Sequence, residues 1–207
     1  MNGVPVRTRP PKKIPTQARA VKRRAAILKG AEKLLVQEGP TAVTTTGISN
    51  AAGVPVGSVY QYFEDRDDIL SNLYDAAYNE VESRVREALA ALAPGQQVRG
   101  TLEEVIRTFW LAAREHPTFR PLTRWANSQR SLWEVTPTLD SSLAALVKAT
   151  LDISGVSLPS GRAEPMMRTM VTTVSILVDQ AIEEDNEAEA EALILEIVQL
   201  LSAYVSQ

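Results

Sequence analysis

The chain has 207 residues, of which 44% are hydrophobic and 23% charged, and both fractions are ordinary for a globular protein. This composition excludes a wholly disordered chain, a collagen-like chain and a disulfide scaffold, and the length allows one large domain or a small domain joined to a larger one. The net charge of −3 hides an asymmetry, because residues 1–66 carry 11 basic and 4 acidic side chains and residues 67–207 carry 11 and 21. The basic first third predicts a nucleic acid or another anionic partner.

The residue types that most often perform catalysis or bind metals are scarce. The chain has no cysteine, which excludes disulfides, thiolate metal clusters and a cysteine nucleophile. His116 is its only histidine, so a multi-histidine metal site is excluded and a Ser-His-Asp triad would depend on this one side chain. We therefore predict no catalytic residues, no bound metal, no cofactor and no enzymatic activity.

No segment predicts export or membrane insertion. The first residues are basic but lack an apolar stretch of signal-peptide length, and no later stretch has about 18 uninterrupted apolar residues. We expect a cytoplasmic protein without a membrane partner.

The first 16 residues contain four prolines and four Lys or Arg residues without apolar periodicity, a composition typical of a disordered basic arm. Two interpretations are equally open: an extension without function, or an accessory arm that contacts phosphate groups. From Gln17 apolar residues recur at helical spacing as far as Gly39, which predicts a first helix. Its many Lys and Arg residues suit either solvent or a nucleic-acid backbone.

Residues 44–70 read TTTGISNAAGVPVGSVYQYFEDRDDIL and carry the most information. A threonine at the start can cap a short helix that ends at Gly53, where a left-handed backbone costs little. Pro55 then begins a second short helix that carries Val59 and Phe63 inward. Two short helices joined by a tight turn that contains glycine form a helix-turn-helix, whose second helix enters the major groove of DNA.

At these residues the sequence resembles the TetR family of one-component transcriptional regulators. The resemblance covers about residues 18–75: a first helix ending in EG, a TT pair at the start of the second helix, AAGVPVGSVYQYF across the turn and recognition helix, and EDRDDIL at the start of the fourth. The other interpretation is a small helical core without DNA-binding function.

The resemblance implies a role for each matching residue. It places Thr45 and Thr46 near phosphates at the start of the second helix, and it assigns Tyr60 and Arg66 to the DNA backbone. It places on the groove-facing side Pro55, Val56, Gly57, Ser58, Gln61 and Tyr62. One departure is Thr46-Gly47, which stands where many relatives carry a longer polar or basic side chain, so a strong base contact from the second helix is not expected.

The remaining chain predicts further helices and no strand. A long helix over residues 67–92 ends at Pro94-Gly95, and later helices are expected at about 101–115, 119–132, 138–152, 164–184 and 187–205. We therefore predict an all-α fold in three parts: a disordered basic arm (1–16), a helix-turn-helix DNA-binding domain (17–66) and a larger helical ligand-binding and dimerisation domain (67–207).

The last two predicted helices are apolar on more than one face, which favours self-association over a simple monomer core. TetR-family relatives similarly pair these helices in a four-helix dimer interface, and two-fold symmetry suits two half-sites on DNA. The interface is expected to contain Val174, Leu177, Ile194, Ile197, Val198, Leu201 and Val205.

Aromatic residues gather between residues 109 and 133, where large rings alternate with a few polar groups as in a ligand pocket. The same rings can equally fill a core. The resemblance favours a pocket, because the family generally houses an inducer site among its middle helices. The expected lining residues are Phe109, Trp110, Phe119, Trp125 and Trp133, with Met167 and Met170 as adaptable walls.

Together these features predict a homodimeric, ligand-responsive transcriptional regulator. In this interpretation it is a repressor that a small-molecule inducer releases from a pseudopalindromic operator in double-stranded DNA. The alternative is a DNA-binding protein without effector response, architectural or chaperone-like. An enzyme is disfavoured, because the sequence offers no convergent catalytic constellation.

Overall fold

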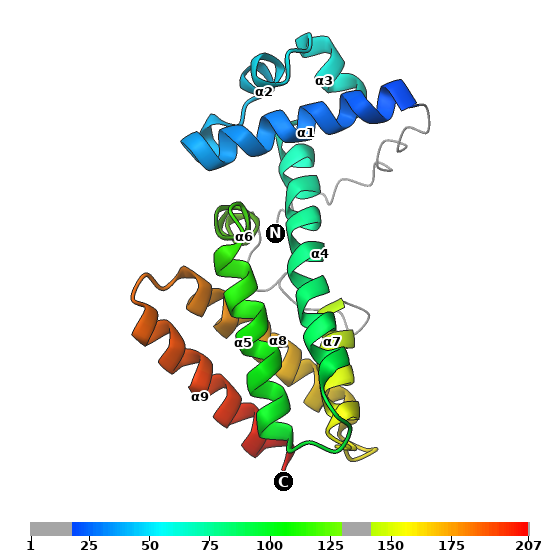
Figure 1. Cartoon of the computed structure of the whole chain (residues 1–207), viewed down its shortest axis with the longest axis vertical. Coiled ribbons are helices and arrows are strands. Elements are labelled where there is room, and N and C mark those ends of the chain that lie inside the picture. Colours follow the sequence, from blue (N-terminus) through cyan, green and yellow to red (C-terminus); the bar gives the residue numbers. More distant parts are fainter. Residues whose placement is uncertain (1–17, 130–141, 207) are drawn as a thin grey trace, which may run out of the picture. The chain divides into compact units, whose positions relative to one another are not determined.

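The computed structural model describes residues 18–129 and 142–206, and every regular element within these ranges is helical (Figure 1). The prediction of an all-α fold is confirmed. The predicted basic arm and Trp133 lie outside the described residues. The chain divides into two compact units, one that ends at Leu73 and one that begins at Tyr74, and the division falls within one helix, α4 (Arg66–Ala91).

The N-terminal unit packs three helices around one apolar core: α1 (Ala18–Glu38), α2 (Thr45–Ala52) and α3 (Val56–Tyr62) (Figure 1). Each helix buries part of one face, with Ile27 on α1, Ile48 on α2 and Val59 on α3 almost wholly removed from solvent. α1 and α2 approach each other closely at Gly30, where a Cβ atom would lie 3.0 Å from the backbone nitrogen of Ala52. A larger side chain at Gly30 would therefore push the two helices apart.

Local hydrogen bonds define the turn between α2 and α3. The Thr44 side chain caps α2 by accepting from the backbone nitrogen of Gly47 at 3.0 Å, as the sequence predicts for a threonine at this helix start. Gly53 ends α2 in the left-handed conformation, with a φ of 63°. The Ser49 hydroxyl donates to the carbonyl oxygen of Val54 at 2.6 Å. These contacts are encoded within a few residues, which is why the turn is readable from sequence.

The C-terminal unit contains the rest of α4 and five further helices: α5 (Val98–Glu115), α6 (Phe119–Ser128), α7 (Ser142–Ile153), α8 (Ala163–Glu183) and α9 (Glu187–Val205). α5 packs against α7, α8 and α9, and α8 also packs against α9 (Figure 1). The described ends lie within a few residues of those predicted, except that the predicted end near 132 and start near 138 lie outside the described residues.

Polar contacts fix these helices against one another. The buried indole of Trp110 on α5 donates to the carbonyl oxygen of Ala181 on α8 at 3.1 Å. Arg107 on α5 pairs with Glu191 on α9. Arg120 on α6 donates to Asp185 at 2.7 Å. This hydrogen bond, together with the positive charge of Arg120, holds the pKa of the Asp185 carboxyl below its ordinary value.

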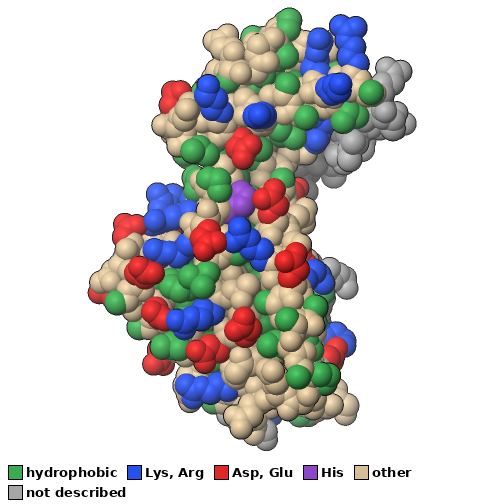
Figure 2. All heavy atoms as spheres, in the orientation of Figure 1, with side chains coloured by type: hydrophobic (Ala, Val, Ile, Leu, Met, Phe, Trp, Pro, Cys, Tyr) green, Lys and Arg blue, Asp and Glu red, His purple; other side chains and the backbone are tan. Residues whose placement is uncertain are grey.

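The two units differ in surface charge. Figure 2 shows Lys and Arg side chains over the visible face of α1, and a mixture of acidic and basic side chains over the C-terminal unit. Lys22, Lys29 and Lys33 on α1 are exposed. None of the described helices is both long and apolar enough to cross a membrane.

The close approach of α1 and α2 generates a test. We expect Gly30→Ala to destabilise the protein by about 1–3 kcal/mol, because the added methyl group overpacks the contact with Ala52. Gly57→Ala is the matched control in the same unit, because a Cβ there has no neighbour within 4 Å. Denaturation of both variants, followed by circular dichroism, gives the free energies of unfolding. An equal or greater loss in Gly57→Ala would contradict the assignment.

Candidate functional site

The exposed surface of α3 has small residues at its start and longer polar side chains at Tyr60 and Gln61. Pro55, Val56, Gly57 and Gln61 are exposed, and the Tyr60 side chain is 49% exposed. A Cβ at Gly57 would have no neighbour within 4 Å, so no residue in the described ranges covers the helix there. A surface of this kind permits the close approach that a helix makes in the major groove, and the Gln61 amide can both donate to and accept from base edges.

Hydroxyl groups gather beside this surface at the start of α2. The Thr45 Oγ1 and Tyr60 Oη atoms lie 3.3 Å apart, so side chains from α2 and α3 meet at this point. Thr46 is exposed next to them. The first N–H groups of a helix have no partner within the helix, and they favour an anion together with nearby hydroxyl donors. The geometry therefore suits a phosphate group.

Two of the predicted contact residues have contacts within the protein. The expectation that Ser58 points outward is wrong, because Ser58 is buried with 8% exposure beside the core residue Val59. Arg66 is engaged inside the unit: its guanidinium donates to the carbonyl oxygens of Val43 at 2.8 Å and Pro40 at 2.7 Å. Arg66 therefore holds the segment between α1 and α2, while 34% of its side-chain surface remains exposed, and its contact with phosphate stays a prediction.

Tyr62 is neither exposed like Gln61 nor buried like Ser58. Its side chain is half-buried, and it follows Ser58 by one helical turn, next to the buried stripe of Val59 and Phe63. Only part of its surface is open to a groove.

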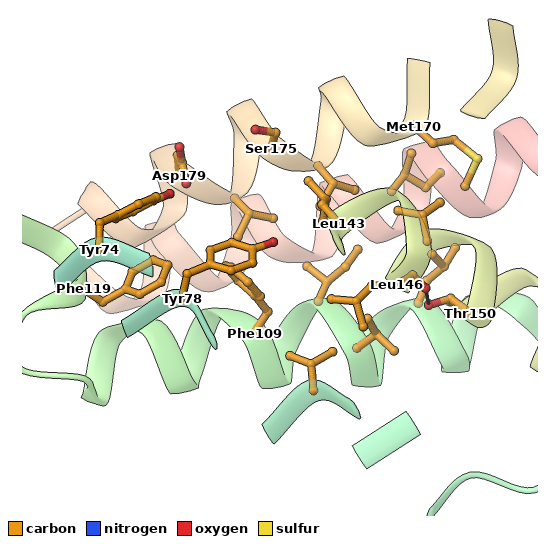
Figure 3. A pocket seen from close by; sticks show the side chains of 18 residues that line it. Tyr74, Tyr78, Phe109, Phe119, Leu143, Leu146, Thr150, Met170, Ser175 and Asp179 are labelled. Atoms are coloured by element: carbon orange, nitrogen blue, oxygen red, sulfur yellow. Dashed lines mark hydrogen bonds between the residues drawn. The ribbon is translucent and has the colours of Figure 1, made fainter. Parts of the chain in front are cut away.

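The C-terminal unit contains a cavity of about 90 Å³ that is partly open to solvent (Figure 3). Its walls come from α4, α5, α6, α7, α8 and α9. Three of the predicted pocket residues line it: Phe109, Phe119 and Met170. The sequence therefore predicted these three residues of the wall and missed the others.

The other predicted pocket residues lie elsewhere. Trp110 is 2% exposed and is not part of the wall, because its ring is held in the core by the bond to Ala181. Trp125 and Met167 are half-buried outside the wall.

One end of the cavity is aromatic and polar. Figure 3 shows Tyr74, Tyr78, Phe119 and Asp179 toward one end, and Met170, Leu146 and Thr150 toward the other. Asp179 accepts at Oδ2 from the Asn127 side chain at 3.0 Å. The described residues that line the cavity include no Lys, Arg or His.

Tyr74, Tyr78 and Asp179 are wall residues that sequence reasoning missed. A usable signal exists for the tyrosines, which stand one helical turn apart beside the apolar stripe of the long predicted helix. Asp179 is a half-buried acid directly after the buried Val178 on α8. An acid in such a position needs a polar partner, which marks it as a candidate site residue.

The Tyr78 phenol is perturbed by its surroundings. Burial raises the pKa of Tyr78 above its ordinary value of 10.0, and the negative charges of Glu82 and Asp179 add to the shift. A hydrogen bond with Ser142 and the charge of Arg86 oppose it. The phenol therefore stays neutral at physiological pH and can act as a hydrogen-bond donor.

The residues predicted for a dimer interface are mostly used within the protomer. Ile194, Ile197 and Val198 on α9 are at most 1% exposed, so the expectation that they form an open face is wrong. Val174 and Leu201 line the cavity, and Leu201 is also buried. Half-buried positions are occupied by Leu177 and Val205.

Apolar side chains that remain exposed on α8 and α9 include Ile176, Leu195 and Leu200, with exposures of 37%, 39% and 53%. Within the described residues, no group of three His, Cys, Asp or Glu side chains is placed to hold a metal ion.

Two family models match the chain. The model described as "Bacterial regulatory proteins, tetR family" matches residues 27–73, and the model described as "Tetracyclin repressor-like, C-terminal domain" matches residues 98–204. The second match alone spans more than half of the chain.

Curated proteins with similar sequences are described as transcriptional regulators. The HTH-type transcriptional repressor KstR2 of Rhodococcus jostii (strain RHA1) is 29% identical over 90 residues, which cover 44% of this chain and 43% of that protein. The HTH-type transcriptional regulator BetI of Stenotrophomonas maltophilia (strain R551-3) is 28% identical over 123 residues, covering 52% and 62%. The matches thus span about half the length of these relatives.

Solved structures resemble the chain over most of its length. A TetR-family transcriptional regulator from Streptomyces coelicolor has a TM-score of 0.61 at 24% identity, covering 89% of this chain and 98% of its own. The fatty acid degradation regulator FadR from Bacillus halodurans has a TM-score of 0.61 at 17% identity, covering 92% and 97%. At these identities the likeness shows the fold alone.

The environment of Tyr78 predicts a pH dependence. The phenol loses its proton near pH 10 in the unfolded chain but at higher pH in the folded protein, so the free energy of unfolding should fall as the pH rises above about 10. Tyr78→Phe should lack this contribution. Urea denaturation of the wild type and of Tyr78→Phe at a series of alkaline pH values measures it, and the difference between the two proteins at pH 7 serves as the reference. Parallel curves for wild type and Tyr78→Phe would show that the phenol is not perturbed.

Proposed function

The chain belongs to the tetR family of bacterial regulatory proteins, which are DNA-binding transcriptional regulators, and from this premise we propose that it is a homodimeric repressor released from a pseudopalindromic operator by a small molecule. The observation that carries the proposal is that one chain combines two features: an α3 surface in a basic segment that no described residue covers at Gly57, and a largely apolar cavity. Because such an operator lies on chromosomal DNA, we place the protein in the cytoplasm, and we propose no catalytic activity.

The DNA contacts divide into two classes. Pro55, Val56, Gly57 and Gln61 would face the major groove, where the small side chains allow close approach and Gln61 reads base edges. Thr45, Thr46 and Tyr60 would bind phosphate and fix the register of the protein on DNA without reading sequence. Tyr62, being half-buried, would reach the groove with only part of its ring.

The effector response is proposed to act through a population shift. The start of α4 supplies the buried residues Ile69 and Leu70 to the N-terminal unit, and the next turns supply Tyr74 and Tyr78 to the cavity wall. A ligand that binds better to a cavity shape incompatible with operator binding would release the DNA. A difference of about 1–3 kcal/mol between the two shapes would weaken operator affinity about 5- to 150-fold.

The proposed dimer surface differs from the predicted one. Leu193, Leu200 and Tyr204 follow each other on α9 at intervals of seven and four residues, which places them along one side of the helix. Leu200 is the most exposed of them, at 53%, and Leu193 and Tyr204 are half-buried. We propose that this stripe, with Ile176 and Leu177 on α8, packs against its copy in a second chain.

The division of DNA contacts can be tested with two substitutions. Tyr60→Phe should weaken binding to operator and to unrelated DNA alike, by about tenfold, because it removes one hydrogen bond to a charged phosphate. The dependence of affinity on salt concentration should keep its slope, since no charge is removed. Gln61→Ala should instead lower the preference for operator over unrelated DNA, by about 1–3 kcal/mol.

Fluorescence anisotropy with labelled operator and scrambled duplexes measures both effects, and the unfolding free energy of each variant serves as the control for folding. A sequence-selective loss in Tyr60→Phe together with a uniform loss in Gln61→Ala would reverse the two assignments.

The dimer surface gives a separate test. Leu200→Arg should raise the dimer dissociation constant at least about tenfold, because burying a leucine side chain contributes about 1.5–3 kcal/mol. Leu111→Arg is the matched control, since Leu111 on α5 is also exposed, at 43%. Sedimentation velocity over a range of concentrations measures the dissociation constants. Unchanged dimerisation in Leu200→Arg, or an equal effect in the control, would exclude this surface.

A further inference from the structure

The chemistry of the cavity wall selects a class of ligand. We propose that the effector is an apolar organic cation, whose amine or quaternary ammonium group binds among Tyr74, Tyr78 and Asp179 and whose apolar body lies along α5, α7 and α8. The inference rests on the proposed function in one respect, namely that this cavity is the effector site.

The first argument is the grouping of aromatic rings at one end of the cavity. Tyr74 and Tyr78 have ring centroids 6.2 Å apart, and the Phe119 ring lies 6.2 Å from Tyr74 and 6.5 Å from Tyr78. Phe109 completes the group at 5.9 Å from Phe119. A cation over the face of such rings is attracted by their quadrupoles, and the attraction is strongest where water is excluded.

The second argument is the sign of the charge on the wall. Asp179 is an acid, and the described lining residues offer no basic side chain to a ligand. A carboxylate has about four lone-pair sites, so Asp179 can accept from an ammonium group while Oδ2 keeps its bond from Asn127. A carboxylate or phosphate ligand would instead lose its hydration next to a like charge, which is strongly unfavourable.

The acidic side chains near Tyr78 also favour a cation. After burial, the charges of Glu82 and Asp179 are what disfavour a negative charge on the phenol, and Arg86 offsets them only in part. The coulombic contributions of Glu82 and Asp179 favour a cation at the same place, whereas the larger effect of burial disfavours a charge of either sign.

The opposite end of the cavity explains why the cation must carry an apolar body. Leu146 and Met170 line that end (Figure 3), and Thr150 uses its hydroxyl to donate to the backbone carbonyl of Leu146 at 2.8 Å. The pocket volume is about 90 Å³, and the pocket is partly open to solvent. Met170 lets its wall adapt to ligands of different shape, because its side chain is unbranched.

Three probes of equal length and different charge test the inference: phenylbutylamine, phenylbutanol and phenylbutyrate. Isothermal titration calorimetry with the full chain, without DNA, should give the amine an affinity at least about tenfold above that of the alcohol, as expected for a desolvated cation on aromatic rings. The carboxylate should bind more weakly than the alcohol.

Asp179→Asn is the decisive variant, because it removes the charge and keeps the shape. It should abolish most of the preference for the amine while leaving the affinity for the alcohol within about twofold. Asp152→Asn, which alters an exposed acid paired with Lys148 on α7, should leave all three affinities unchanged. Tyr78→Phe should retain the preference, because the ring remains.

The proposal is overturned if no probe binds, if phenylbutyrate binds as tightly as the amine, or if Asp179→Asn leaves the preference intact. Operator release is measured separately by anisotropy. If the amine binds with the expected preference but operator affinity does not change, the cation site stands and the ligand-responsive function fails.

Discussion

The indole of Trp110 fixes how α5 lies against α8, and the geometry of the cavity depends on this contact. Its nitrogen donates to the Ala181 carbonyl oxygen in an environment without solvent, where an unpaired donor would be costly. Trp110 is adjacent to Phe109, and Ala181 follows Asp179 by two residues. The same hydrogen bond therefore sets the relative positions of an aromatic ring and a carboxylate that both line the cavity.

In the N-terminal unit, helix packing and the exposed surface of α3 depend on small residues. Gly30 lets α1 and α2 approach closely, Gly53 turns the chain between α2 and α3, and Gly57 leaves α3 without a side chain at a point that faces solvent. Each glycine removes an obstacle of a different kind: steric contact between helices, backbone strain, and distance to a partner surface. Replacing any one of them by a larger residue would affect only its own part of this arrangement.

The sequence predicted features that are encoded locally. Helix positions follow from apolar spacing, and the turn before α3 follows from Thr44, Gly53 and Pro55, which act within four residues of their own positions. The outward direction of Ser58 was predicted wrongly because α3 has only two turns, so a position beside Val59 is as close to the core as to solvent. The structural role of Arg66 could not be predicted, because its acceptors, Val43 and Pro40, lie more than twenty residues away in the chain.

Long-range packing decides the roles that the sequence left open. The apolar stripe of α9 is broad enough to serve a core or an interface, and contact with α5 and α8 places Ile194 and Val198 in the core. Aromatic residues are likewise suited to a cavity wall and to solid packing, and Trp110 is distinguished from Phe109 only by the partner that its nitrogen finds on α8. Spacing along one helix cannot identify that partner.

The distribution of charge relates the two proposed binding events. Residues 67–207 carry 11 basic and 21 acidic side chains, and this excess of negative charge repels DNA and leaves docking to the basic N-terminal segment. The same negative field attracts a cation toward the C-terminal unit before any contact forms, and Asp179 continues that sign into the cavity wall. An acidic ligand would have to approach against this field and would find no basic side chain among the described lining residues. One charge asymmetry thus favours DNA at one unit and an organic cation at the other, without requiring the two sites to share a residue.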